Sequence, residues 1–132
     1  MRFLRLAFAA ALIAALAGCT SQPTPNAQAC QGWEKANNAW VAAEGSDATS
    51  AASIAAHRAS LRDDLASAAS TASGGIATAM KRTLQAMPEN ALHIIEPGSA
   101  ARPEYTANST RVAEACAKGG DQVELQAPPA TP

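Results

Sequence analysis

The sequence predicts an all-α protein that folds as a small bundle of three or four helices. Alanine, the residue with the highest helix propensity, occurs 28 times among the 114 residues from position 19 to position 132. The large apolar residues of this part recur at helical spacings, as expected for the amphipathic helices of a bundle. They number only 17, counting Leu, Ile, Val, Met, Trp and Tyr, so the core that they can build is thin.

The first 19 residues differ in character from the rest of the chain. Arg2 and Arg5 give a positively charged start, residues 6–15 are all apolar, and the run ends in Leu16-Ala17-Gly18-Cys19. These are the parts of an export signal, and the apolar run is too short for a membrane-spanning helix, which needs about 20 residues. Its last four residues resemble the lipobox of bacterial lipoproteins.

The resemblance implies that residues 1–18 are a cleaved signal peptide and that Cys19 becomes the lipidated first residue. Lipoproteins carry a diacylglycerol on this sulfur and often a further acyl chain such as palmitate, and two or more chains anchor a protein stably. Residues 19–28 contain two prolines and are then expected to form a short polar tether. We therefore expect membrane lipid as a partner through Cys19, and a location on the outer face of the cell membrane, or in the outer membrane of a double-membraned host.

A first helix is predicted over residues 26–44, with Asn26 as its N-cap. Cys30, Trp33 and Trp40 fall on one face of this helix at helical spacing. Two tryptophans on such a stripe are usually buried, which favours a role in the core. The alternative is an exposed aromatic platform, which makes Trp33 and Trp40 a candidate binding face for a sugar or a partner.

A second helical segment is predicted from about residue 48 to residue 87, with Asp47 as its N-cap and Pro88 after its end. Its apolar stripe keeps the same phase across Gly74-Gly75, although each glycine costs a helix about 1 kcal/mol relative to alanine. Two alternatives follow. The glycines form a tight turn between two antiparallel helices, which gives four helices in all, or the helix continues or kinks there, which gives three.

The polar face of this segment carries His57, Asp63 and Asp64, residue types that also serve in metal and acid–base sites. Pairs that share a helix face need a spacing of three or four residues, whereas His57 precedes these carboxylates by six and seven. The spacing favours a solvated charged face, and no metal site is predicted.

Residues 88–101 interrupt the helical pattern with a short apolar cluster between prolines, which we expect to form a packed loop, a short strand or a single turn. A last helix is predicted over residues 103–118, because proline suits its first turn and two glycines follow its end. The helical domain is thus expected over residues 29–120. Residues 121–132, which are rich in proline near their end, are predicted to be a disordered tail.

The two cysteines outside the signal are expected to form a disulfide. If Cys19 carries lipid, Cys30 and Cys116 form the one remaining pair, and exported proteins mature where such pairs oxidise. The bond would staple a thin bundle by closing a long loop. A redox or metal-binding pair is the alternative, but it lacks a C-x-x-C spacing, and neither His57 nor His93 lies at ligand spacing from a cysteine.

Composition and motifs exclude several classes of function. The sequence has no G-x-S-x-G, H-E-x-x-H, P-loop or dinucleotide-binding glycine pattern, so we predict no catalytic residue and no cofactor. Removal of residues 1–18 leaves a net charge of (10 − 2) − 11 = −3, which argues against nucleic-acid binding. We expect a non-enzymatic cell-envelope lipoprotein that acts as a structural or protein-interaction module and contacts an envelope protein or the cell wall. The alternative is a lipoprotein that binds a small ligand or glycan, or that inhibits infection as phage-exclusion lipoproteins do.

Overall fold

The computed structural model of the protein describes residues 21–129, and this part of the chain is all-helical, as predicted. The expected signal peptide and the expected lipidation site, Cys19, lie outside the described residues. The helices are α1 (Pro25–Glu44), α2 (Ala51–Ala69), α3 (Gly74–Ala86), α4 (Leu92–Ile95) and α5 (Ala101–Lys118).

The first helix begins earlier than the sequence analysis placed it. Thr24 is the N-cap of α1, and its Oγ1 accepts a hydrogen bond from the Ala27 N–H at 3.1 Å. Pro25 follows at the first helical position, where its missing N–H costs nothing. The prediction of Asn26 as the cap is therefore wrong, and the expected tether over residues 19–28 is shortened because helix starts at residue 25.

The chain breaks between two helices just before Gly74-Gly75, which decides between the two alternatives. α2 ends at Ala69, a turn follows, and α3 begins at Gly74, whose φ of 61° favours glycine. Asn26 has its role here, because its Oδ1 accepts a hydrogen bond from the Ser73 N–H at 2.8 Å and ties this turn to the start of α1. The four-helix alternative is confirmed, with the short α4 as an additional turn.

The second helix begins later than predicted, because a serine close to its start supplies the cap. The Ser50 Oγ accepts a hydrogen bond from the Ser53 N–H at 3.2 Å, so α2 starts at Ala51 and the prediction of Asp47 as N-cap is wrong. The connector after α3 forms one helical turn, α4, which is one of the three forms expected for it. The last helix starts at Ala101, two residues before the predicted Pro103.

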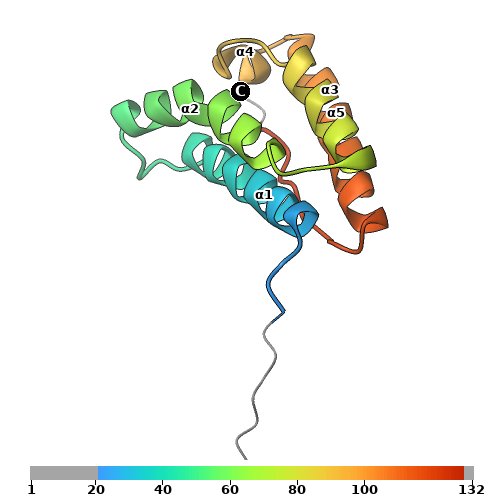
Figure 1. The fold of residues 1–132 in the computed structure, drawn as a ribbon. Coiled ribbons are helices and arrows are strands. Elements are labelled where there is room, and N and C mark those ends of the chain that lie inside the picture. Colours follow the sequence, from blue (N-terminus) through green and yellow to red (C-terminus); the bar gives the residue numbers. More distant parts are fainter. Residues whose placement is uncertain (1–20, 130–132) are drawn as a thin grey trace, which may run out of the picture.

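The helices pack as two antiparallel pairs, α1 with α2 and α3 with α5, and α4 lies at the end of the molecule opposite the start of α1 (Figure 1). The core lies between these pairs. Both tryptophans of α1 belong to it, together with aliphatic side chains from every other helix. The other large apolar side chains with at most 1% exposure are Leu61, Leu65, Met80, Ile94 and Val112.

A disulfide joins Cys30 and Cys116, as predicted, and its two Cα atoms lie 6.0 Å apart. Because one cysteine is near the start of α1 and the other near the end of α5, the bond closes the bundle at one end. A simple bundle of three equal helices would have placed these two ends on opposite sides.

The described part of the C-terminal segment packs against the bundle. After α5, residues 121–129 run back along α1 in an extended conformation (Figure 1). We call these residues the C-terminal arm. The sequence analysis predicted a disordered tail over residues 121–132, and over the arm that prediction is wrong, because four hydrogen bonds join it to α1.

Candidate functional site

The two tryptophans of α1 are core residues and not a binding face. Trp33 is 0% exposed and Trp40 is 1% exposed, so neither ring can stack on a sugar or a partner. Trp40 meets the Tyr105 ring of α5 edge-to-face, with centroids 5.8 Å apart and planes at 84°. The favoured interpretation of Trp33 and Trp40 as core residues is therefore confirmed, and the alternative of a binding face is wrong.

A nearly buried ion pair fastens the end of α1 to α2. The Glu44 carboxylate accepts hydrogen bonds from Arg58 Nε at 2.6 Å and Nη2 at 2.7 Å, and from Trp40 Nε1 at 3.1 Å. The Glu44 side chain is only 3% exposed, so this two-pronged arrangement is largely shielded from water. The hydrogen bond to Glu44 raises the pKa of the Arg58 guanidinium, so Arg58 keeps its charge. Both oxygens of the Glu44 carboxylate are thereby occupied by hydrogen bonds.

A second polar cluster lies inside the bundle, where α1 faces α5. The Tyr105 hydroxyl donates a hydrogen bond to Asn37 Oδ1 at 2.8 Å, and the Asn37 side chain is fully buried. Burial raises the pKa of the Tyr105 phenol well above its usual range, so the hydroxyl stays protonated and remains a donor. This contact fixes Asn37 so that its Nδ2 points toward the arm, to the Gln126 carbonyl oxygen at 3.0 Å.

Three neighbouring side chains of α1 bind the backbone of the arm. The Glu124 N–H donates to Glu34 Oε1 at 2.8 Å, and the Glu124 carbonyl accepts from Asn38 Nδ2 at 2.8 Å. The Gln126 N–H donates to Asn38 Oδ1 at 2.9 Å, and the Gln126 carbonyl accepts from Asn37, as above. Both backbone polar groups of residues 124 and 126 are thus paired, much as a neighbouring β-strand would pair them.

The side chains of the arm alternate between the bundle and the solvent. Val123 and Leu125 are partly buried against the core, Glu124 and Gln126 are exposed, and Pro128 is buried. We call the surface of α1 and α5 that holds these residues the arm groove. This groove was not predicted, although the alternation of apolar and polar residues over 123–126 is the pattern of an extended segment with one buried face.

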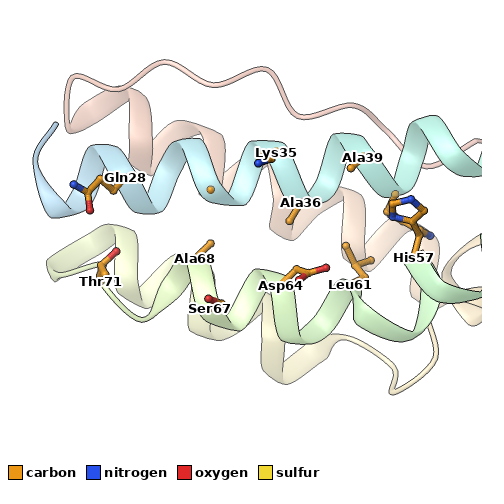
Figure 2. A pocket seen from close by; sticks show the side chains of 12 residues that line it. Gln28, Lys35, Ala36, Ala39, His57, Leu61, Asp64, Ser67, Ala68 and Thr71 are labelled. Carbon is orange, nitrogen blue, oxygen red and sulfur yellow. The ribbon is translucent and has the colours of Figure 1, made fainter. Parts of the chain in front are cut away.

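A second groove lies between α1 and α2 and has a volume of about 480 Å³ (Figure 2). Its floor is made by small residues, and at Gly32 the helices come so close that an added Cβ would lie 3.1 Å from the Ala68 Cβ. Lys35 from α1, and His57 and Asp64 from α2, stand along its rim. No hydrogen bond or ion pair joins these three side chains in the described structure, so the groove has charged groups but no catalytic constellation.

Within residues 21–129, no group of three or more His, Cys, Asp and Glu side chains is arranged to hold a metal ion. The His57, Asp63 and Asp64 side chains do not form a joint site, and His93 contacts Glu96 on the surface at 3.0 Å. In the same part of the chain, no helix combines the length and apolar character needed to span a bilayer. Comparison with protein-family models, with curated proteins and with solved structures finds no match for this chain.

Proposed function

We propose that this protein is a lipid-anchored lipoprotein of the cell envelope and that its helical domain is a non-enzymatic structural or protein-interaction module. The observation that carries the proposal is the use of the three cysteines. Cys30 and Cys116 bond to each other, which leaves Cys19, at the end of the lipobox-like segment, as the one cysteine open to acylation. The disulfide supports export, because such bonds persist in oxidising compartments outside the cytoplasm.

The short stretch of sequence between Cys19 and α1 determines how such an anchor would orient the domain relative to the membrane. Only residues 20–24 separate Cys19 from the first helix, and five extended residues span at most about 18 Å. The end of the bundle with the disulfide would then lie next to the membrane. The far end of α1, about 30 Å away for a helix of this length, would face outward with Glu44 and α4.

The hydrogen bonds of the buried polar side chains favour an interaction module over an enzyme. The buried polar side chains of α1 bond to α2, α5 and the arm, so they hold the fold together rather than line an open cleft. The α1/α2 groove is the best support for the alternative of a small-ligand protein, since its volume falls within the usual range of about 300–1,000 Å³ for ligand pockets. Glycan binding through exposed tryptophans is not supported, because both tryptophans are buried. A phage-exclusion protein would be the same module with a phage protein as its partner.

The anchor is tested by metabolic labelling of the full chain in a bacterium with an alkyne-bearing fatty acid. We expect the label on the wild-type chain, none on Cys19→Ser, and the label retained on the double variant Cys30→Ser/Cys116→Ser. Detergent phase partition should follow the label, with the wild type in the detergent phase. A wild-type chain that carries no label and keeps residues 1–18 would overturn the lipoprotein proposal.

The interaction is tested separately with the secreted chain that carries Cys19→Ser and lacks lipid. This chain is immobilised and exposed to solubilised envelope and to purified cell wall, before and after reduction of the disulfide. Retention of one envelope protein that is lost on reduction supports a module that recognises its partner through the folded bundle. Retention of a small metabolite in the α1/α2 groove, lost in Ala36→Leu, would instead favour the small-ligand alternative.

A further inference from the structure

We propose that the arm groove is a binding site for an extended peptide segment of a partner protein, and that the C-terminal arm occupies this site in cis until the partner displaces it. This inference rests on the proposed function, because it names the class of partner that the interaction module takes. The arm is the evidence for the chemistry of the site, since it shows which kind of polypeptide the groove accepts.

The polar side chains of the groove bind the main chain of the arm. Glu34, Asn37 and Asn38 together satisfy the N–H and carbonyl groups of residues 124 and 126, with distances from 2.8 to 3.0 Å. Asn38 alone bonds to two residues that are two positions apart, through its Nδ2 and its Oδ1. Any extended chain offers these backbone groups, so this arrangement binds extended peptides with little regard to sequence.

The side-chain positions of the arm define the pattern that a partner segment would need. Val123 and Leu125 pack toward the bundle, and Pro128 is buried three residues later. The intervening residues face solvent and are unconstrained. A partner segment is therefore extended, apolar at positions i and i+2, and carries proline at i+5.

The arm leaves part of the groove unfilled. Open spaces of about 610 Å³ and about 270 Å³ flank Val123 on either side, the first against Ala113 and Ala117 and the second against Ser109. Ser109, which lines the second space, is 7% exposed. A segment with a larger apolar side chain at the position of Val123 fills space that the arm leaves open.

The attachment of the arm allows it to leave. Gly120, with a φ of 93°, belongs to the cap of α5, and the Asp121 N–H still donates to the Cys116 carbonyl at 3.0 Å. The part of the arm that can leave without disturbing α5 therefore begins at residue 122. A tethered arm competes at an effective concentration in the millimolar range. The arm of a second copy would make the same contacts as the arm in cis and would therefore not displace it. The occupant that we propose is a foreign segment that makes better contacts.

The test uses the whole secreted chain with Cys19→Ser, in which the arm is weakened by Val123→Ser/Leu125→Ser. The probe is a fluorescent peptide with residues 121–129 in which leucine replaces Val123. A matched control peptide has the same sequence and carries N-methyl groups at the positions of Glu124 and Gln126, which removes two donors. Binding is followed by fluorescence anisotropy, and circular dichroism checks that each variant keeps its helices.

We expect the probe to bind the arm-weakened chain at least about tenfold more tightly than the wild-type chain. Addition of Asn38→Ala should weaken that binding by about tenfold or more, because two hydrogen bonds are lost, and N-methylation should do the same. Equal binding of both peptides, or no binding to an arm-weakened chain that is folded, would overturn the proposal. Formation of a dimer that excludes the probe would also overturn it, in favour of exchange of arms between copies.

A second measurement does not depend on the weakened variant. With the wild-type chain, excess probe should accelerate hydrogen exchange at the amides of Glu124 and Gln126 and leave the exchange of α1 unchanged. Unchanged exchange of both amides at saturating probe would contradict displacement. Neither experiment involves lipid or the envelope, so their failure would leave the labelling result standing, and a failed labelling experiment would leave the peptide site standing.

Discussion

At the scale of single residues, three polar side chains of α1 connect that helix to three different neighbours. Glu44 binds Arg58 of α2, Asn37 binds Tyr105 of α5, and Asn38 binds the arm. Polar groups that are shielded from water contribute little while they are paired but cost about 1–3 kcal/mol when a partner is lost. Substitutions at these positions should therefore destabilise the fold more than their small contact areas suggest.

Glu44→Gln should lower the free energy of unfolding by about 2 kcal/mol. The amide keeps one acceptor oxygen but loses the charge, so Arg58 is left with a weaker partner in a shielded site. Chemical denaturation at neutral pH measures the effect, with Glu114→Gln on the exposed face of α5 as the control. Equal losses for both variants would show that the Glu44 pair contributes no more than an ordinary surface charge.

Tyr105→Phe should lower the free energy of unfolding by about 1–3 kcal/mol, because Asn37 Oδ1 loses its buried donor. It should also change the response to alkaline pH. Burial raises the pKa of Tyr105 in the folded state, so in the wild type its contribution is complete below about pH 10 and is lost as the pH rises above the pKa of the unfolded phenol.

This loss can reach about 1.4 kcal/mol per pH unit for one proton, and the variant lacks it. The measurement is denaturation from pH 8 to pH 11 on both proteins. The difference in stability between wild type and Tyr105→Phe should shrink above pH 10. A difference that stays constant across this range would mean that the Tyr105 hydroxyl ionises as easily in the folded protein as in the unfolded chain.

At the scale of the elements, the close approach of α1 to α2 depends on small residues at the crossing. Gly32 faces Ala68 with no room for a Cβ at ordinary van der Waals distance, whereas a Cβ on Gly75 in the first turn of α3 would meet nothing within 4 Å. The two glycines thus have opposite roles. One allows two helices to pack, and the other only lowers the stability of a helix start.

Gly75→Ala should stabilise the protein by about 0.4–1 kcal/mol, since alanine restricts the unfolded chain and fits the helix. Gly32→Ala should destabilise it instead, because α2 must shift away to relieve a 3.1 Å contact between two Cβ atoms that cannot rotate aside. The melting temperatures of the two variants give the comparison. If both substitutions stabilise the protein, α1 and α2 can move apart at Gly32 without a loss of stability, which would contradict this prediction.

The elements also show what could be predicted from the sequence and what could not. The helical periodicity placed every long helix to within a few residues, and the burial of Trp33 and Trp40 followed from their shared stripe. The caps were misassigned because Thr24 and Ser50 compete with Asn26 and Asp47 a few positions away. The alternation over residues 123–126 indicates an extended segment, but its place on α1 could not be predicted, because the hydrogen bonds come from side chains 86 to 90 residues away in the sequence.

At the scale of the whole molecule, a thin core is supplemented by a covalent bond across the ends of the chain. The large buried side chains are few for a domain of this size, and the disulfide links positions 86 residues apart. In the chain-entropy model, closing a loop of that length contributes about 4–5 kcal/mol, a large share of the roughly 5–15 kcal/mol that stabilises ordinary domains.

Cys30→Ser/Cys116→Ser should therefore lose about 4–5 kcal/mol of stability and be partly unfolded at 37 °C. Denaturation with guanidinium, with and without reductant, measures this loss. The wild type should fall to the level of the variant when it is reduced, and the variant should be insensitive to reductant. A variant as stable as the oxidised wild type would mean that packing alone sustains the bundle.

The disulfide also determines how the molecule responds to a pull on its two ends. A force applied between residue 24, where α1 begins, and residue 121, where the arm begins, travels through Cys30, across the sulfur–sulfur bond and out through Cys116. The α2, α3 and α4 helices and most of α1 and α5 lie outside this path, so they bear no tension. A partner that grips the arm could therefore pull against whatever holds the N-terminal end without unfolding the bundle, which would act as a short inextensible link.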